Sequence, residues 1–117
     1  MFPAYVIITV LTMVANACVA VADLVGARFV LANMDEVGVP RSWLAPLGVL
    51  KAAGAAGLLF GLLGLQPLGI AAAVGLVLFF AGALAAHIRA HVFYNIAFPG
   101  AFFALAVAST AVAVAGH

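Results

Sequence analysis

The sequence predicts an all-α, polytopic membrane protein whose four transmembrane helices form an antiparallel bundle. Of its 117 residues, 69% are hydrophobic and only 6% are charged, whereas a soluble domain carries about 25% charged residues. Three stretches, 1–22, 52–88 and 90–117, contain no Asp, Glu, Lys or Arg. About 20 apolar residues are enough to cross a bilayer as a helix. A soluble fold would therefore leave too much apolar surface against water.

The composition also limits the function classes. The formal net charge is +1 and there is no basic run, so nothing indicates a nucleic-acid partner. The length allows a single domain, residues 1–117, without a separate soluble module. Cys18 is the only cysteine, and we interpret it as a small buried apolar residue. The first apolar run has no basic segment before it and is too long for a signal peptide, so we expect it to be retained.

The first span is expected at about residues 3–26. Pro3 lies in its first turn, where the missing N–H of proline costs nothing. A polar connection, 28–41, follows the span and is broken by glycine and proline near its end. Within the connection, one group of apolar residues predicts a short amphipathic turn on the membrane surface: Phe29, Val30, Leu31 and Met34.

The second span is expected at about 43–64, with Ser42 as its N-cap and Trp43 as an interfacial anchor. The uncharged stretch that follows Lys51 is too long for one crossing. Gly64-Leu65-Gln66-Pro67 divides it, and this predicts a tight hairpin. The third span is then expected at about 67–88.

The fourth span is expected at about 96–115, with Pro99 near its start. Small residues favour close helix contacts in lipid, and four glycines share one broad face of the second span: Gly54, Gly57, Gly61 and Gly64. We expect this face to pack within the bundle, and a contact between two copies of the chain is the alternative.

The basic residues predict how the bundle is oriented. All four lie in or beside the first and third connections: Arg28, Arg41, Lys51 and Arg89. The positive-inside rule places these connections in the cytoplasm. Both termini of this integral protein of the cell membrane are then expected outside the cytoplasm.

Polar residues of the first two spans point to the same end of the bundle. Thr9, Asn16 and Asp23 are seven residues apart, so they share one helix face. That face must turn inward, because lipid offers no hydrogen-bond partner. Asn16 either joins helices by a hydrogen bond or contributes to a site. Lys51, about two turns into its span, either snorkels to the interface or pairs with Asp23.

His87 and His91 are four residues apart and would share a face if the helix continued. This spacing suits a metal ion or haem, but a third ligand would have to be Asp23 or Glu36, and there is no H-E-x-x-H motif or cysteine pair. Neither a metal nor a haem is therefore expected. The alternatives are a hydrogen-bonded interfacial pair or a role in proton transfer or ligand contact.

Together these residues predict a polar pocket that opens to the cytoplasmic interface, because an ionisable cluster inside a membrane marks a candidate site. No catalytic residue is assigned. The candidate ligand-binding residues are Asn16, Asp23, Lys51, His87, Arg89, His91 and Asn95.

The predicted pocket suits an amphiphile such as a quinone or an isoprenoid-like molecule. Its polar head would meet the ionisable groups, and its tail would lie among the phenylalanines. The alternative for these side chains is core packing or lipid contact: Phe60, Phe79, Phe80, Phe102 and Phe103.

Two segments also carry a resemblance to a known family. One is Leu47-Gly48-Val49-Leu50-Lys51-Ala52-Ala53-Gly54, preceded by Gly38-Val39-Pro40, and the other is His87-Ile88-Arg89-Ala90-His91 with Asn95 after it. With these segments the chain resembles, over nearly its whole length, the DoxX-like family of small four-helix membrane proteins. The family takes its name from a membrane subunit of a thiosulfate:quinone oxidoreductase.

The resemblance implies a four-helix membrane fold and an association with quinones or redox chemistry. It does not imply thiosulfate oxidation. We expect no extracytoplasmic domain, and the sequence has no second cysteine, so thiol or sulfur chemistry is not expected.

Three functions follow from these patterns. The first is a membrane protein that binds a small apolar or amphiphilic molecule, with a quinone-linked redox accessory as its narrower form. The second is a membrane-embedded isomerase or hydrolase, with Asp23 or a histidine as general base and Lys51 or Arg89 as electrophile. The third is a non-catalytic structural or chaperone subunit. The expected partners are membrane lipids and the small molecule, and either a second copy or another membrane subunit.

Overall fold

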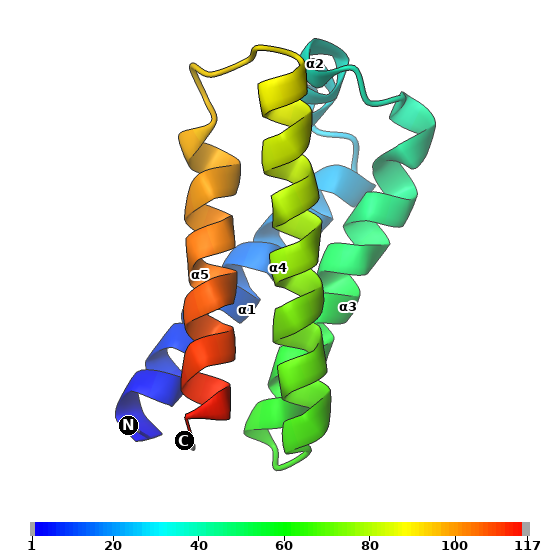
Figure 1. Ribbon diagram of the computed structural model, residues 1–117. Coiled ribbons are helices and arrows are strands. Elements are labelled where there is room, and N and C mark those ends of the chain that lie inside the picture. The colour runs from blue at the N-terminus through cyan, green and yellow to red at the C-terminus, as the bar shows by residue number, and fades with distance from the viewer. Residues whose placement is uncertain (1, 116–117) are drawn as a thin grey trace.

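Four long helices pack side by side in an antiparallel bundle, as the computed structural model of residues 2–115 shows (Figure 1). Each is long and apolar enough to cross a membrane. The long axis of the bundle measures 40 Å, close to the thickness of a bilayer with its headgroup regions. The fold class predicted from the sequence is confirmed. The long helices are α1 (Phe2–Leu24), α3 (Leu44–Leu62), α4 (Gln66–Arg89) and α5 (Ala97–Val114).

The helices form a closed ring in which α1 packs on α3, α3 on α4, α4 on α5, and α5 on α1. The main buried cluster comprises Leu58, Ala73, Leu76, Phe80 and Ala106. A smaller cluster of Tyr5, Val112 and Ala113 lies near the termini. Large apolar side chains on the opposite helix faces, such as Ile7 and Leu78, are exposed. A membrane-spanning bundle presents such faces to lipid.

The α3–α4 hairpin is packed through glycine. A Cβ atom built at Gly57 would lie 2.5 Å from the Cβ of Ala72, and one at Gly61 would lie 2.7 Å from the Cα of Gly69. The glycine face therefore packs within the bundle, on α4, as expected. Gly64 does not belong to this face: it lies beyond the end of α3 with φ +113°, a backbone conformation that favours glycine and closes the turn.

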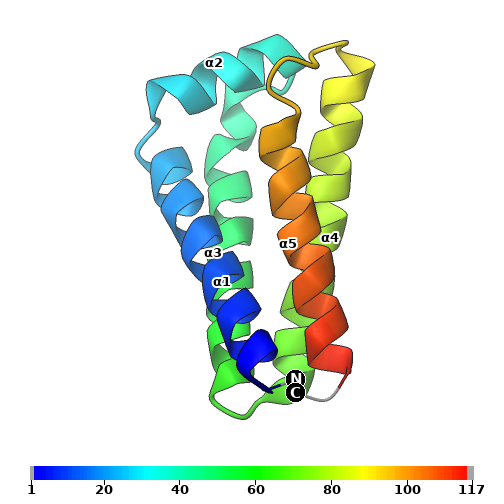
Figure 2. The ribbon, with the colours of Figure 1, turned by 90° about the vertical axis from the view of Figure 1, so that its left-hand side faces the viewer.

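The connection between α1 and α3 forms a second layer over one end of the bundle. It contains α2 (Arg28–Val37), which lies across the ends of the long helices, and the short 3₁₀ turn η1 (Arg41–Trp43) (Figure 2). Gly26 and Gly38 flank α2 with φ of +67° and +75°. The predicted amphipathic turn is therefore a complete helix of 10 residues, with Met34 buried and Phe29 exposed.

The helix ends lie within two residues of the expected spans, but two further details of the prediction were wrong. Ser42 makes no N-cap hydrogen bond, because it lies inside η1 and this turn runs directly into α3. Cys18 is exposed, since it lies on the outer face of α1 rather than in the core.

Both ends of the described chain lie at the same end of the bundle as the α3–α4 turn (Figure 2). The opposite end carries α2 and the connection between α4 and α5 (Figure 1). The basic residues gather near this second end, as the sequence indicated. That it faces the cytoplasm stays a prediction.

Candidate functional site

The inward face of α1 carries the polar residues that the spacing predicted. Thr9, Asn16 and Asp23 are all buried, with at most 2% of each residue exposed. Asp23 lies one residue before the end of α1, near the layer formed by α2. Its carboxylate is therefore placed inside the bundle but close to the membrane interface.

Asp23 and Lys51 form an ion pair between α1 and α3. The Nζ atom of Lys51 donates a hydrogen bond to Oδ2 of Asp23 at 2.7 Å, and only 11% of the lysine side chain is exposed. Gly48, one helical turn before Lys51, allows this approach, because a Cβ there would lie 3.0 Å from the Cβ of Asp23. The Nζ atom also lies 5.3 Å from the ring centroid of Phe79, a cation–π distance. The predicted pairing is confirmed.

His87 lies in the last turn of α4 and is 3% exposed. Its Nδ1 atom lies 2.9 Å from the carbonyl oxygen of Ala83. A carbonyl oxygen only accepts hydrogen bonds, so Nδ1 carries the proton. The Nε2 atom is buried and has no hydrogen-bond partner among the described residues.

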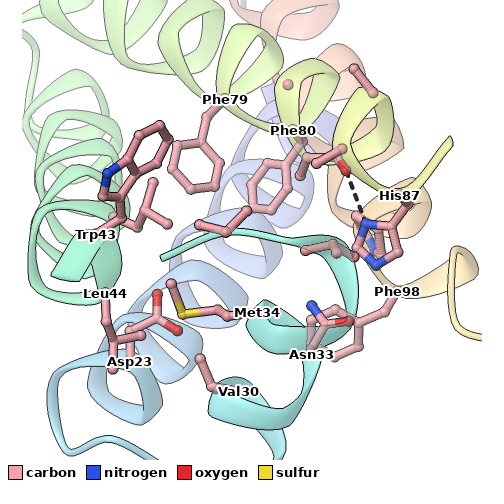
Figure 3. Close-up of a pocket in the computed structure, with 18 of the residues that line it drawn as sticks. Asp23, Val30, Asn33, Met34, Trp43, Leu44, Phe79, Phe80, His87 and Phe98 are labelled. Carbon is pink, nitrogen blue, oxygen red and sulfur yellow. Dashed lines mark hydrogen bonds between the residues drawn. The ribbon is translucent and has the colours of Figure 1, made fainter. Parts of the chain in front are cut away.

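A cavity of about 470 Å³ brings these three side chains together. This volume lies within the usual range of ligand sites, about 300–1,000 Å³. Figure 3 shows Phe79, Phe80 and His87 projecting from α4 on one side, with Asp23 and Met34 on the opposite side. The polar residues of the lining are Asp23, Asn33, Lys51, His87 and Arg89, and most of the others are apolar. The cavity is thus amphipathic.

α2 covers the cavity and contributes Val30, Asn33, Met34 and Val37 to its lining. Asn95, in the connection between α4 and α5, donates a hydrogen bond to Oδ1 of Asn33 at 3.0 Å. Asn95 therefore supports the lining through Asn33 and does not itself line the cavity.

A second hydrogen bond ties the same connection to α2. The hydroxyl of Tyr94 donates to Oε1 of Glu36 at 2.6 Å. This bond, aided by the negative charge of Glu36, raises the pKa of Tyr94 above its usual value. On the outer side of α2, Arg41 forms an exposed pair with Asp35 at 2.8 Å and lowers the pKa of that carboxyl. Together these contacts hold α2 across the end of the bundle.

Two of the predicted site residues lie elsewhere. Asn16 is fully buried, donates to the carbonyl of Thr12 at 2.9 Å, and does not line the cavity. His91 does not share a helix face with His87, because α4 ends at Arg89 and His91 has φ +57° in the exposed connection. No group of three metal-ligating side chains occurs among residues 2–115.

The phenylalanines are only partly as expected. Phe79 and Phe80 line the cavity, together with Phe98, which the sequence reasoning missed. Phe60 is exposed on the outside of the bundle. Phe102 and Phe103 pack against the main core cluster.

The sequence reasoning also missed a polar contact between α1 and α5. The hydroxyl groups of Thr12 and Ser109 lie 2.7 Å apart and are buried. Thr12 is four residues before Asn16, so a search for inward-facing polar residues at helical spacing would have found it.

The comparisons with known proteins agree with this fold. A family model described as the DoxX-like family matches residues 7–109. The matched segment contains Asp23, Lys51 and His87 and spans α2. No curated protein and no solved structure matches the chain.

Proposed function

The chain belongs to the DoxX-like family, and on that basis we propose that it binds a small amphiphilic molecule in the cavity beneath α2. One observation supports this proposal above the others. The Asp23–Lys51 pair and His87 line the same cavity as Phe79 and Phe80. A molecule with a polar head and an apolar body complements such a lining.

A quinone-linked redox accessory is the narrower form of this proposal. The apolar walls suit a quinone ring and its tail, and Lys51 offers N–H groups to a ring oxygen. The quinone would supply electron transfer, and this chain would bind and orient it.

The ion pair favours binding over the enzymatic alternative. A general base must be free to take a proton from the substrate. The carboxylate of Asp23 is engaged by the ammonium group of Lys51 at 2.7 Å. We therefore propose no catalytic role for Asp23.

Two matched glycine variants on α4 test the proposal. A side chain added at Gly82 or at Gly75 would enter open space, but Gly82 lines the cavity and Gly75 lies in a groove on the outer side of the α3–α4 hairpin. The protein is purified in mild detergent, and its bound molecules are extracted and identified by mass spectrometry.

We expect wild type and Gly75→Leu to retain one enriched amphiphile. Gly82→Leu should reduce its amount at least about tenfold, because a clash of about 1.4 kcal/mol is sufficient for that loss. Equal amounts in folded wild type and Gly82→Leu, or no enriched molecule in wild type, would contradict the proposal.

We further propose that α2 and the cavity beneath it lie on the cytoplasmic side. This orientation is supported by the position of Arg28, Arg41, Lys51 and Arg89 near that end of the bundle.

A further inference from the structure

We infer that the occupant of the cavity is an uncharged amphiphile whose head carries a hydroxyl group, and that this hydroxyl donates a hydrogen bond to Nε2 of His87. The inference rests on the proposed function, because it names the chemical class of the molecule bound in the same cavity.

The first step is the hydrogen-bonding state of His87. Nδ1 holds its proton against the carbonyl of Ala83 at 2.9 Å. The described residues place no carboxylate in contact with the ring, and an unpaired cation is costly in an apolar site. In the tautomer that holds its proton on Nδ1, Nε2 is an acceptor.

The second step is the cost of leaving this acceptor unpaired. Nε2 is buried and has no partner within residues 2–115. A buried polar atom without a hydrogen bond is destabilising. The ring lines the cavity, so a bound molecule with an O–H group is a suitable donor.

The third step concerns charge. The carboxylate of Asp23 and the ammonium of Lys51 neutralise each other inside the cavity. Arg89 also lines the cavity, but it is an exposed residue at the end of α4, where it can reach lipid headgroups. Outside the Asp23–Lys51 pair, a charged head would have only the exposed Arg89 as a counter-ion, which favours a neutral head.

The fourth step separates a hydroxyl from other neutral heads. An oxidised quinone has only acceptor oxygens, and an ether likewise cannot donate, so both would leave Nε2 unpaired. The reduced quinol of a quinone-linked accessory, in contrast, carries hydroxyl groups that can donate. Lys51 has N–H groups beyond the one bonded to Asp23. A hydroxyl group can donate to His87 and also accept from a neighbouring N–H.

Trp43 provides a direct measurement of binding. It is the only tryptophan in the sequence, and it lines the cavity (Figure 3). The full chain in lipid nanodiscs is titrated with three probes that share one hydrocarbon body: farnesol, farnesyl methyl ether and farnesoic acid. The change in Trp43 fluorescence is recorded, and Gly82→Leu gives the background caused by probe that dissolves in the lipid.

We expect farnesol to bind about tenfold more tightly than the ether, because one additional hydrogen bond to a buried acceptor contributes about this factor. Farnesoic acid, which is anionic at neutral pH, should bind more weakly than farnesol. His87→Phe should abolish the preference for farnesol over the ether, because the acceptor Nε2 is then absent. His91→Asn, a change outside the cavity at a left-handed position that asparagine tolerates, should keep the preference.

The outcomes separate this inference from the proposed function. If no probe changes Trp43 fluorescence beyond the Gly82→Leu background, the proposal of an amphiphile site fails. If the probes bind but wild type does not prefer farnesol over the ether, or prefers the acid, only the hydroxyl inference is overturned. It is also overturned if folded His87→Phe keeps the preference.

Discussion

The Asp23–Lys51 pair is the residue-level feature on which the cavity depends. Each charged group lies inside an apolar bundle, and each is the partner that the other requires. Gly48 makes the contact geometrically possible by bringing α1 and α3 together. Removing one partner should therefore be worse than removing both.

The first prediction concerns this pair. Asp23→Asn should destabilise the bundle by about 3–5 kcal/mol, since it leaves the ammonium of Lys51 buried without a counter-ion. The double variant Asp23→Asn with Lys51→Met should recover most of that loss. The stability of the single and the double variant is measured by heating each in detergent and using size-exclusion chromatography to quantify the protein that stays folded. Asp35→Asn breaks only an exposed pair and serves as the control with little expected change. Equal stability of the single and double variants would contradict the prediction.

For single residues, the sequence predicts those side-chain pairs that follow from depth in the membrane and from spacing along a helix. Asp23 and Lys51 were paired correctly because two charges at one depth in an apolar medium require each other. His91 was placed wrongly because its position depends on where α4 ends. Nothing local in Arg89-Ala90-His91 resembles a glycine or proline stop signal, and the left-handed backbone of His91 is visible only in the structure.

Among the elements, the α3–α4 hairpin is held by close backbone approach. Gly57→Leu should destabilise the bundle by about 1–3 kcal/mol, because the added side chain would have to displace Ala72 from contact. Gly75→Leu, on α4, meets open space and should have a melting temperature close to that of wild type. The melting temperature in detergent is the measurement. An unchanged melting temperature for Gly57→Leu would show that α3 and α4 can move apart at this point without loss of stability.

The second element with a testable property is α2, through its bond to Tyr94. Ionisation of the phenol would break the hydrogen bond and place two anions together, so the folded protein holds the pKa of Tyr94 above its usual value. The stabilisation by this bond is present below about pH 10, the usual tyrosine pKa, and is lost as the pH rises through the higher folded value.

Glu36→Ala should therefore lower the pKa of Tyr94 towards that of a free tyrosine. Absorbance of tyrosinate during a pH titration measures it, and Tyr94→Phe identifies the contribution of the second tyrosine, Tyr5. If wild type and Glu36→Ala titrate alike, the contact between α2 and the connection 90–96 does not persist in solution.

The position of α2 marks the limit of prediction at the element scale. Its apolar residues indicated an amphipathic segment on the membrane surface, and this was enough to expect a turn. Its place over the cavity depends on contacts with residues far away in the sequence, Asn95 and Tyr94. Asn33, Met34 and Phe98 were missed as lining residues for the same reason.

For the whole molecule, hydropathy and turn residues were sufficient to predict the four-helix bundle. Long uncharged segments in lipid favour helices over irregular structure, because a helix satisfies every backbone polar group internally. The cavity was foreseen as a polar pocket, but its volume and walls arise from packing of α1, α2, α3, α4 and the first turn of α5 together. Patterns within single helices carry no information on such a space.

The last prediction concerns the orientation of the whole bundle. A reporter that is active only outside the cytoplasm should be active when fused after the C-terminus, since the basic residues gather at the opposite end. A reporter active only in the cytoplasm should be active when inserted in the connection 90–96. The reverse pattern would place the cavity on the outer side of the membrane.

The Asp23–Lys51 pair also has a consequence for biogenesis. Its members are 28 positions apart and belong to different membrane-crossing helices. During synthesis, α1 enters the insertion machinery while Lys51 is still inside the ribosome, and the carboxylate of Asp23 then has no counter-ion. Release of α1 alone into lipid is therefore disfavoured until α3 arrives. The pair thus favours joint release of α1 and α3. A chain that stops before Lys51 keeps the carboxylate of Asp23 without a counter-ion in the membrane, a feature that cellular quality control can recognise.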